Sequence, residues 1–185
     1  MKVKSALLAF VLASLCCSAV AAGKHRPRAA AAAVATFDAD IRAIGGPIVS
    51  DGAALVAPLT TVTALCNNST GGQCLTATGT VTLETGSIAS GDYQNGATFA
   101  SGGSVTISAT DSTDSVDFTG VVTSATWTAA RLANGTYTYT LTGNIQDSTT
   151  GQTGAFALVT TVIGAANVKF PGNAVVNYIS IHLNP

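Results

Sequence analysis

The residues that could carry chemistry in this chain are few and lie far apart. A serine or cysteine nucleophile needs a base within hydrogen-bond reach and a third group that orients this base. After residue 22 the chain has two histidines, His25 in a basic stretch and His182 near the C-terminus, and it has no G-x-S-x-G motif. We therefore predict no catalytic residues, and we interpret His182 as an ordinary side chain on the polar face of the last strand.

The densest group of acidic residues is a candidate calcium site. Asp111, Asp114 and Asp117 follow each other at three-residue spacing in the segment ATDSTDSVDF. Calcium takes about six to eight oxygen ligands, but the spacing does not fit an EF-hand loop, which needs a glycine and a final glutamate. Because aspartate and serine also favour turns, we interpret the segment as a turn and keep a calcium site as the alternative. No other cofactor is expected.

The segment CNNSTGGQC, from Cys66 to Cys74, predicts a disulfide bridge, which we call the staple. The other two cysteines, Cys16 and Cys17, fall in the predicted signal peptide, so an exported chain keeps one pair in an oxidising compartment. A zinc site would need about four ligands, and a redox site is more typical of Cys-x-x-Cys. We therefore predict a Cys66–Cys74 disulfide, which would contribute about 2 to 3 kcal/mol of stability.

Aromatic residues are the other candidates for ligand contact, because carbohydrate-binding proteins use exposed rings as platforms. Trp127, Tyr137 and Tyr139 alternate with polar residues in apolar strand phases, so burial in the core is the expectation for these rings. Tyr93 in SGDYQNG is flanked by turn residues, and we expect it to be the most exposed ring. Tyr93 and Trp127 are the candidate ligand contacts.

The N-terminal segment has the pattern of a secretory signal peptide. Lys2 and Lys4 precede the apolar run ALLAFVLASLCCSAV, and small residues follow it. We therefore expect a secreted protein, either extracellular or periplasmic and at the cell surface, without a transmembrane anchor. The predicted segments are a signal peptide over 1–22, a basic and alanine-rich leader over 23–36, and one domain over 37–185.

Charge and composition exclude one class of partner. Only 9% of the residues are charged, and after residue 36 three basic residues, Arg42, Arg131 and Lys169, face nine carboxylates. An acidic domain lacks the positively charged surface that binds the phosphates of nucleic acid. Threonine and glycine supply the polar and turn positions instead, as is typical of half-buried pleated surfaces.

Alternation of apolar and polar residues predicts an all-β fold. In TYTYTLT, Tyr137, Tyr139 and Leu141 share one face, and the Asn134-Gly135 pair before it predicts a hairpin turn. The preceding strand changes phase at Gly120, which indicates a bulge there, and puts Val121 on the apolar face with Ala125 and Trp127. The segment DSTTGQTG predicts a second turn.

The remaining segments add weaker strands and one helix. In AVVNYISIHL we expect Val175, Ile179, Ile181 and Leu183 to form one face of a strand. The segment Asp38–Ile44 is the candidate helix, capped by Asp38. About eight short antiparallel strands predict a β-sandwich or a partly open barrel.

Three functions fit these expectations. The first is a non-catalytic structural or surface-interaction protein of the cell surface, a matrix or a fibre, with other copies or surface components as partners. The second is a carbohydrate-binding module for a polysaccharide, supported by calcium, which predicts a row of exposed rings. The third is a small secreted hydrolase, which predicts two carboxylates close together.

Overall fold

The computed structural model describes residues 37–185, in which every regular element is a strand apart from one short 3-10 helix. The predicted signal peptide (1–22) and leader (23–36) lie outside the described residues. The elements are β1 (Ala39–Ile44), β2 (Pro47–Ser50), β3 (Leu55–Asn67), η1 (Asn68–Thr70), β4 (Gln73–Thr76), β5 (Thr78–Thr85), β6 (Ile88–Asp92), β7 (Gly96–Phe99), β8 (Gly102–Thr110), β9 (Ser115–Arg131), β10 (Tyr137–Asp147), β11 (Thr153–Val162) and β12 (Ala174–Asn184).

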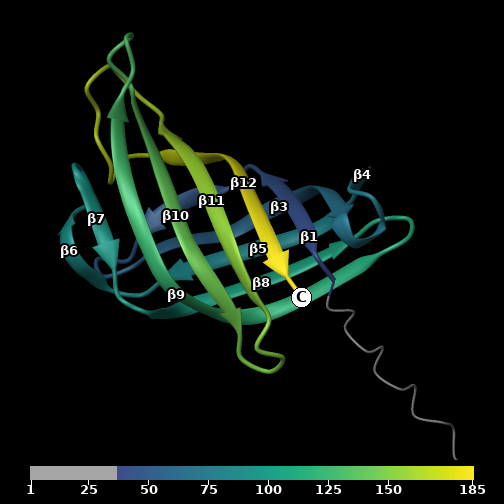
Figure 1. The fold of residues 1–185 in the computed structure, drawn as a ribbon. Helices are drawn as coiled ribbons and strands as arrows, with labels where there is room; N and C mark the ends of the chain where they lie inside the picture. Colours follow the sequence, from purple (N-terminus) through teal and green to yellow (C-terminus); the bar gives the residue numbers. More distant parts are fainter. Residues whose placement is uncertain (1–36) are drawn as a thin grey trace, which may run out of the picture. The chain divides into compact units, whose positions relative to one another are not determined.

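The strands form one antiparallel sheet that closes into a barrel. Eight strands follow each other around the ring in the order β9, β10, β11, β12, β1, β3, β5 and β8, and β8 pairs with β9 again. The long strand β9 belongs to both the front and the back of the barrel in Figure 1. The prediction of an all-β fold is confirmed, and the sheet is a closed ring where the sequence predicted a sandwich or a partly open barrel.

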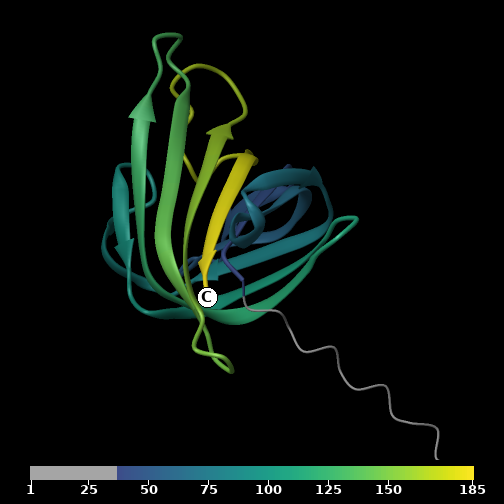
Figure 2. The same ribbon diagram turned by 45° about the vertical axis from the view of Figure 1, so that its right-hand side comes forward.

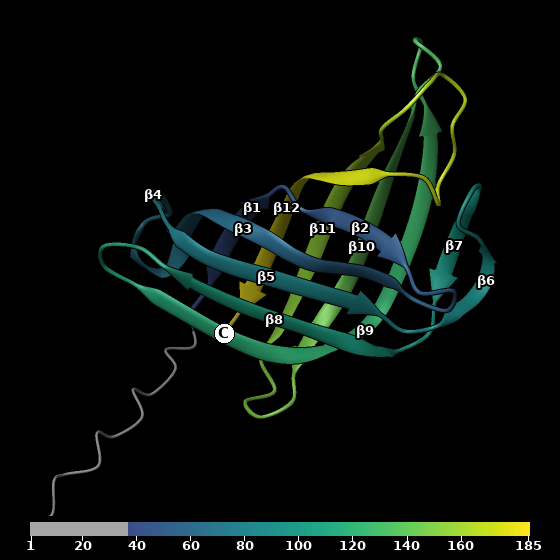
Figure 3. The same ribbon diagram turned by 180° about the vertical axis from the view of Figure 1, so that it is seen from behind.

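Four shorter strands complete the sheet outside this ring path. β4 pairs with β3, and the β6–β7 hairpin pairs with the second half of β9. β2 continues β1, because Ala43 faces Ile179 of β12 and Pro47 faces Val175 in the same register. β1 and β2 are therefore one barrel strand with a short interruption, and Figure 3 shows both beside β3.

Glycine is required at this interruption. Gly45 and Gly46 have φ angles of 77° and 85°, and their backbone groups exchange hydrogen bonds with Val176. A Cβ atom at Gly46 would lie 1.9 Å from the carbonyl oxygen of Leu59, whereas one at Gly45 would meet open space. Gly46 therefore allows β3 to approach the strand closely, and Gly45 supplies a left-handed turn of the backbone.

The predicted helix over Asp38–Ile44 is wrong, because these residues form β1. Ala39, Ile41 and Ala43 point into the barrel and are at most 1% exposed. β1 is hydrogen-bonded on both sides, to β12 and to β3. Pairing on both edges, together with burial of this alternating face, outweighs the local preference of an aspartate for a helix start.

The core fills the barrel with side chains from all eight strands. Trp127, Tyr139, Phe118 and Phe170 are the largest fully buried residues. Trp127 and Tyr139 stack with ring centroids 4.8 Å apart. Phe170 comes from the loop between β11 and β12, and its backbone N–H donates to the Tyr139 hydroxyl. The burial of Trp127 and Tyr139 that the alternation predicted is confirmed.

The phase change in β9 occurs later than predicted. Val122 pairs with Ile145 and Ser124 pairs with Asn144, so the extra residue of the bulge is Thr123. Val122 is fully buried, whereas Val121 is 39% exposed, and the prediction that Val121 faces the core is wrong. The inward position before Val122 is Gly120, where a Cβ atom would lie 2.2 Å from the carbonyl oxygen of Gln146.

A second bulge changes the prediction for the last strand. Tyr178 pairs with Val159 and Val176 pairs with Thr160, which leaves Asn177 as the extra residue of β12. Ile179, Ile181 and Leu183 are buried as predicted. Val176 is buried with them, whereas Val175 is 36% exposed, so Val175 was assigned to the wrong face.

Both predicted hairpin turns are confirmed. Leu132–Thr136 joins β9 to β10, and 148–152 joins β10 to β11. The longer connection between β11 and β12, over 163–173, lies beside the first of these turns (Figure 2). The backbone N–H of Asn167 donates to the carbonyl of Gly135 at 2.9 Å. This contact and the burial of Phe170 hold the connection against the barrel.

Candidate functional site

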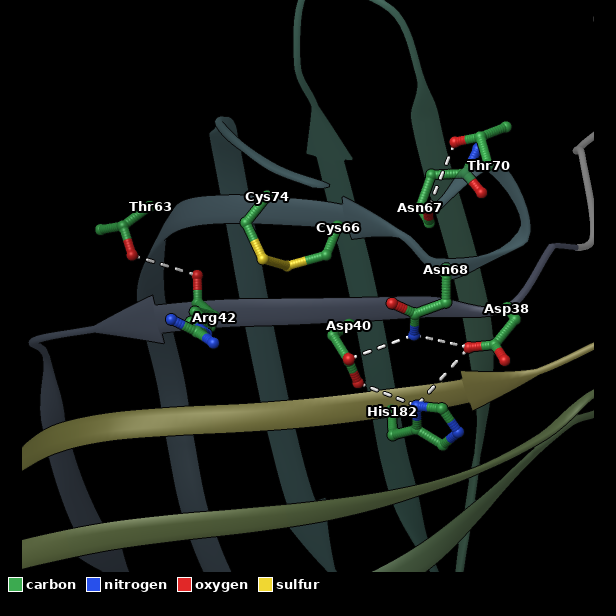
Figure 4. Close-up of a disulfide and its surroundings, with 10 residues drawn as sticks. All are labelled: Asp38, Asp40, Arg42, Thr63, Cys66, Asn67, Asn68, Thr70, Cys74 and His182. Atoms are coloured by element: carbon green, nitrogen blue, oxygen red, sulfur yellow. Dashed lines mark hydrogen bonds and ion pairs between the residues drawn. A yellow bond between two sulfur atoms is a disulfide. The ribbon is translucent and has the colours of Figure 1, made fainter. Parts of the chain in front are cut away.

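The predicted disulfide is present and links facing residues of a hairpin. Cys66 on β3 pairs directly with Cys74 on β4, and their sulfur atoms are 2.09 Å apart. The hairpin turns through η1 and two glycines, and the side chain of Asn67 accepts from the backbone N–H of Ser69. Cys66 is 1% exposed, so the staple sits at the edge of the core and fixes the end of β3 (Figure 4).

A polar cluster that the sequence analysis missed lies beside this staple. We call Asp38, Asp40, Asn68 and His182 the His182 cluster, which is drawn in Figure 4. Asp40 Oδ1 lies 2.8 Å from His182 Nδ1, and Asp38 Oδ1 lies 3.7 Å from the same atom. The amide of Asn68 donates to both carboxylates, at 2.8 and 3.1 Å. The cluster therefore joins β1, β12 and the β3–β4 hairpin over 66–74 that the disulfide closes, which we call the staple hairpin.

The contacts of His182 favour its protonated form. Nδ1 faces a carboxylate oxygen, and Nε2 lies 3.1 Å from Asn184 Oδ1, so both ring nitrogens face acceptors. The hydrogen bond to Asp40 raises the pKa of His182 above its ordinary value. A general base must be unprotonated and must face its nucleophile. In His182 the Nε2 atom, which would face a nucleophile in a catalytic dyad, faces the Asn184 side chain, and Nδ1 pairs two strands through Asp40.

The structure shows a turn at the predicted acidic cluster. Asp111 Oδ1 accepts from the backbone N–H groups of Thr113 and Asp114, and Asp114 Oδ2 accepts from Asn67 Nδ2 at 3.2 Å. Asp117 lies further along, exposed on β9 and opposite Ser108. Over residues 37–185, no three His, Cys, Asp or Glu side chains converge to hold a metal ion. Calcium binding at this turn stays a prediction.

The two candidate aromatic residues are in contact at the edge of the core. The indole N–H of Trp127, which is 1% exposed, donates to the carbonyl oxygen of Tyr93 at 2.9 Å. The Tyr93 ring is half-buried against Phe99 and Phe170, with centroids 6.4 and 5.8 Å away. The hydroxyl oxygen of Tyr93 is buried and has no hydrogen-bond partner. Tyr178, at 47% exposed, is more accessible than Tyr93, which the sequence analysis expected to be the most exposed ring.

Of the depressions on the outer surface, two lie beside the features that bear on a function. The first is polar, measures about 350 Å³ and lies between the staple hairpin and the aspartate turn. The second is mostly apolar and measures about 360 Å³. It lies between β2, the start of β12 and the two ends of the 163–173 connection. The residues of the first are Asn67, Thr70, Gln73, Leu75, Asp111, Thr113 and Asp114.

Comparison of the chain with protein-family models, with curated proteins and with solved structures found no match. Within the described range 37–185, no helix has the length and apolar character needed to cross a membrane.

Proposed function

We propose that this chain is an exported, non-catalytic structural or surface-interaction protein. The observation that carries the proposal is the filled interior of the barrel. Buried apolar side chains from every strand of the ring pack into one core, so the described domain has to meet its partners on its outer surface. Cell-surface, matrix and fibre components, including other copies of the chain, are the partners that we propose.

The disulfide supports the proposed location. Disulfides persist in oxidising compartments and are rare in reducing ones. The Cys66–Cys74 bridge therefore fits the secretion that we infer from the N-terminal residues. The contacts of His182 support a non-catalytic role, since a small secreted hydrolase, the third candidate, would need an imidazole that faces a nucleophile or two carboxylates that face a substrate.

A fibre subunit that donates its last strand to a neighbour is disfavoured by the closed ring. β12 is hydrogen-bonded to β11 on one side and to β1 on the other. Donation of this strand would break both ladders and expose Ile179, Ile181 and Leu183, which are at most 1% exposed. Lateral contact between intact barrels is therefore the form of association that we propose.

A carbohydrate-binding module is the second candidate, and the polar depression beside the staple favours it. Its amide, hydroxyl and carboxylate groups are of the kind that bind sugar hydroxyls, and Leu75 supplies an apolar contact. Because Trp127 is buried, binding would depend on hydrogen bonds and not on a row of rings. Calcium held by Asp111 and Asp114 would support this site.

One experiment separates these functions. The mature chain is incubated with insoluble polysaccharides and with chromogenic esters and glycosides, with and without calcium. The proposal predicts no turnover above the blank and no calcium-dependent retention, together with binding to cell-surface material or to other copies. Retention that Gln73→Ala abolishes and Val121→Ala leaves unchanged would instead establish the carbohydrate-binding module. Turnover that His182→Ala removes would contradict the proposal.

A further inference from the structure

Six exposed apolar residues gather where β1–β2, β3 and β12 run side by side. At five of the positions the exposed fractions are 48% for Ile44, 46% for Val49, 55% for Leu59, 56% for Ile163 and 36% for Val175. The sixth residue, Pro47, is also exposed and pairs with Val175. We call the set Ile44, Pro47, Val49, Leu59, Ile163 and Val175 the apolar patch.

The packing of a single barrel does not explain why these apolar side chains are exposed. Asp40 and Arg42 are outward residues at one end of the β1–β2 strand, and Ile44 and Val49 are outward residues at the other end. The neighbouring strands change in the same direction, though not at one level. β12 runs from His182 and Ser180 through the exposed Tyr178 and Asn177 to Val175, and on β3 Thr61, which pairs with Ile44, still precedes Leu59. Three adjacent strands thus replace polar outward residues by apolar ones together, which isolated surface apolar residues do not do.

The patch combines a hollow with projecting side chains. Ile48 and Ala174, which are buried, lie at the bottom of the apolar depression, and Val49, Val175 and Ile163 lie along its sides. Figure 3 shows β2 beside β3 and the start of β12, the strands that bear this surface. Because more than half of the surface of Ile163 and of Leu59 is exposed, each can enter the hollow of a facing molecule. A twofold contact requires this kind of self-complementary surface.

The absence of charge at the patch permits a second copy as the partner. None of the six patch residues is ionisable, whereas residues 37–185 carry nine carboxylates against Arg42, Arg131 and Lys169. Two copies repel each other through their net negative charge in any orientation, but at the patch they also bury apolar surface and bring no charged patch residue into contact. Five of the six side chains are between 36% and 56% exposed, and the patch presents on the order of a few hundred Å² of apolar surface, which can form the core of a dimer interface of about 800 Å² per partner.

We infer that the apolar patch is the face of a homodimer, in which two barrels pack patch to patch around a twofold axis. The inference rests on the proposed function and names its partner, a second copy of this chain. Because the contact is apolar and the subunits are both acidic, added salt strengthens the dimer by screening the repulsion between them.

The test is the molar mass of the purified mature chain over a range of concentrations, measured by sedimentation equilibrium. The expected result is a dimer whose dissociation constant rises more than about tenfold in Val175→Asp and in Ile163→Asp. Val121→Asp is the matched control, since Val121 is 39% exposed on β9 and Val175 is 36% exposed on β12. Circular dichroism and thermal unfolding establish that each variant is folded, and Ile163→Ser provides a milder change in a loop.

The alternative outcomes overturn the inference in different ways. A wild-type chain that stays monomeric up to millimolar concentration has no such dimer. A dimer that Val175→Asp, Ile163→Asp and Ile163→Ser leave intact uses another face, and the proposed interaction function then stands without the patch. A monomer that binds polysaccharide through the patch, and loses this binding in Val175→Asp, shows that the patch has a different partner.

Discussion

The two ends of the same three strands differ sharply on their outer face. At one end of β12, β1 and β3, the outward groups are His182, Asp40 and the staple hairpin, and they are bonded to one another. At the other end the outward residues are Val175, Val49 and Leu59, and they are exposed to solvent. The inward residues are apolar apart from Thr60 of β3, so the main change is on the outer face.

The difference is the basis of the proposed dimer face. The polar end satisfies its hydrogen-bonding groups within the chain, through carboxylates, an amide and an imidazole, and a covalent bridge holds it in place. The apolar end contains groups that gain free energy only when another surface covers them. The first end is therefore held by bonds within the chain, and the proposed association belongs to the second. Three predictions sharpen this comparison, from the largest expected effect to the smallest.

Gly46, between the two ends, is the position where a single methyl group should cost most. Gly46→Ala places a Cβ atom 1.9 Å from the Leu59 carbonyl oxygen, so β3 has to move away from the strand. We expect the free energy of unfolding to fall by about 3 kcal/mol or more, as measured in urea. Gly45→Ala is the control, because its Cβ meets open space and its φ of 77° costs only about 1 to 2 kcal/mol. Equal losses in the two variants would contradict this explanation.

Removal of the disulfide should weaken the polar end and leave the apolar end unchanged. In the Cys66→Ser, Cys74→Ser double variant we expect a loss of about 2 to 3 kcal/mol in unfolding free energy, because the open hairpin adds entropy to the unfolded chain. Chemical unfolding measures the loss, and sedimentation equilibrium at the same temperature measures self-association. We expect the dimer dissociation constant to stay the same while the protein is folded, and a change as large as that in Val175→Asp would show that the two ends are coupled.

Deprotonation of His182 should give the smallest effect. Because its pKa is raised in the folded state, the stabilisation is complete below the unfolded value of about 6.5 and is lost as the pH rises through the folded pKa. With side chains about 40% exposed, the ion pair contributes less than about 1 kcal/mol. The difference in unfolding free energy between the wild type and His182→Gln should therefore shrink as the pH rises above about 6.5. An unchanged difference would contradict the ion pair.

Local sequence signals predicted several parts of the fold correctly. The disulfide follows from two cysteines in a short turning segment, and the β9–β10 hairpin follows from Asn134 and Gly135 between two alternating runs. The burial of Trp127 and Tyr139 follows from the period-2 alternation. In each case residues close together in sequence determine the outcome, because turns and strand faces are local properties.

The predictions that were wrong depended on contacts between distant segments. Asp38–Ile44 has a local helix signal, but β12 and β3 draw it into the barrel as a strand. The bulges at Thr123 and Asn177 follow from the register of the neighbouring strands, and each moves a valine between faces. The His182 cluster brings together side chains more than a hundred positions apart, as Asp40 and His182 are, which no short motif can indicate.

The sequence by itself determined the strand-forming character of the chain, its turns, its disulfide and its low charge, because each depends on residue type and on near neighbours. The tertiary structure alone decided that the sheet closes, that β1 and β2 are one barrel strand, and that polar and apolar outward residues separate to opposite ends of three strands. The physical reason is register: a shift of one residue between paired strands exchanges the inner and outer faces, and register is set only when distant strands meet.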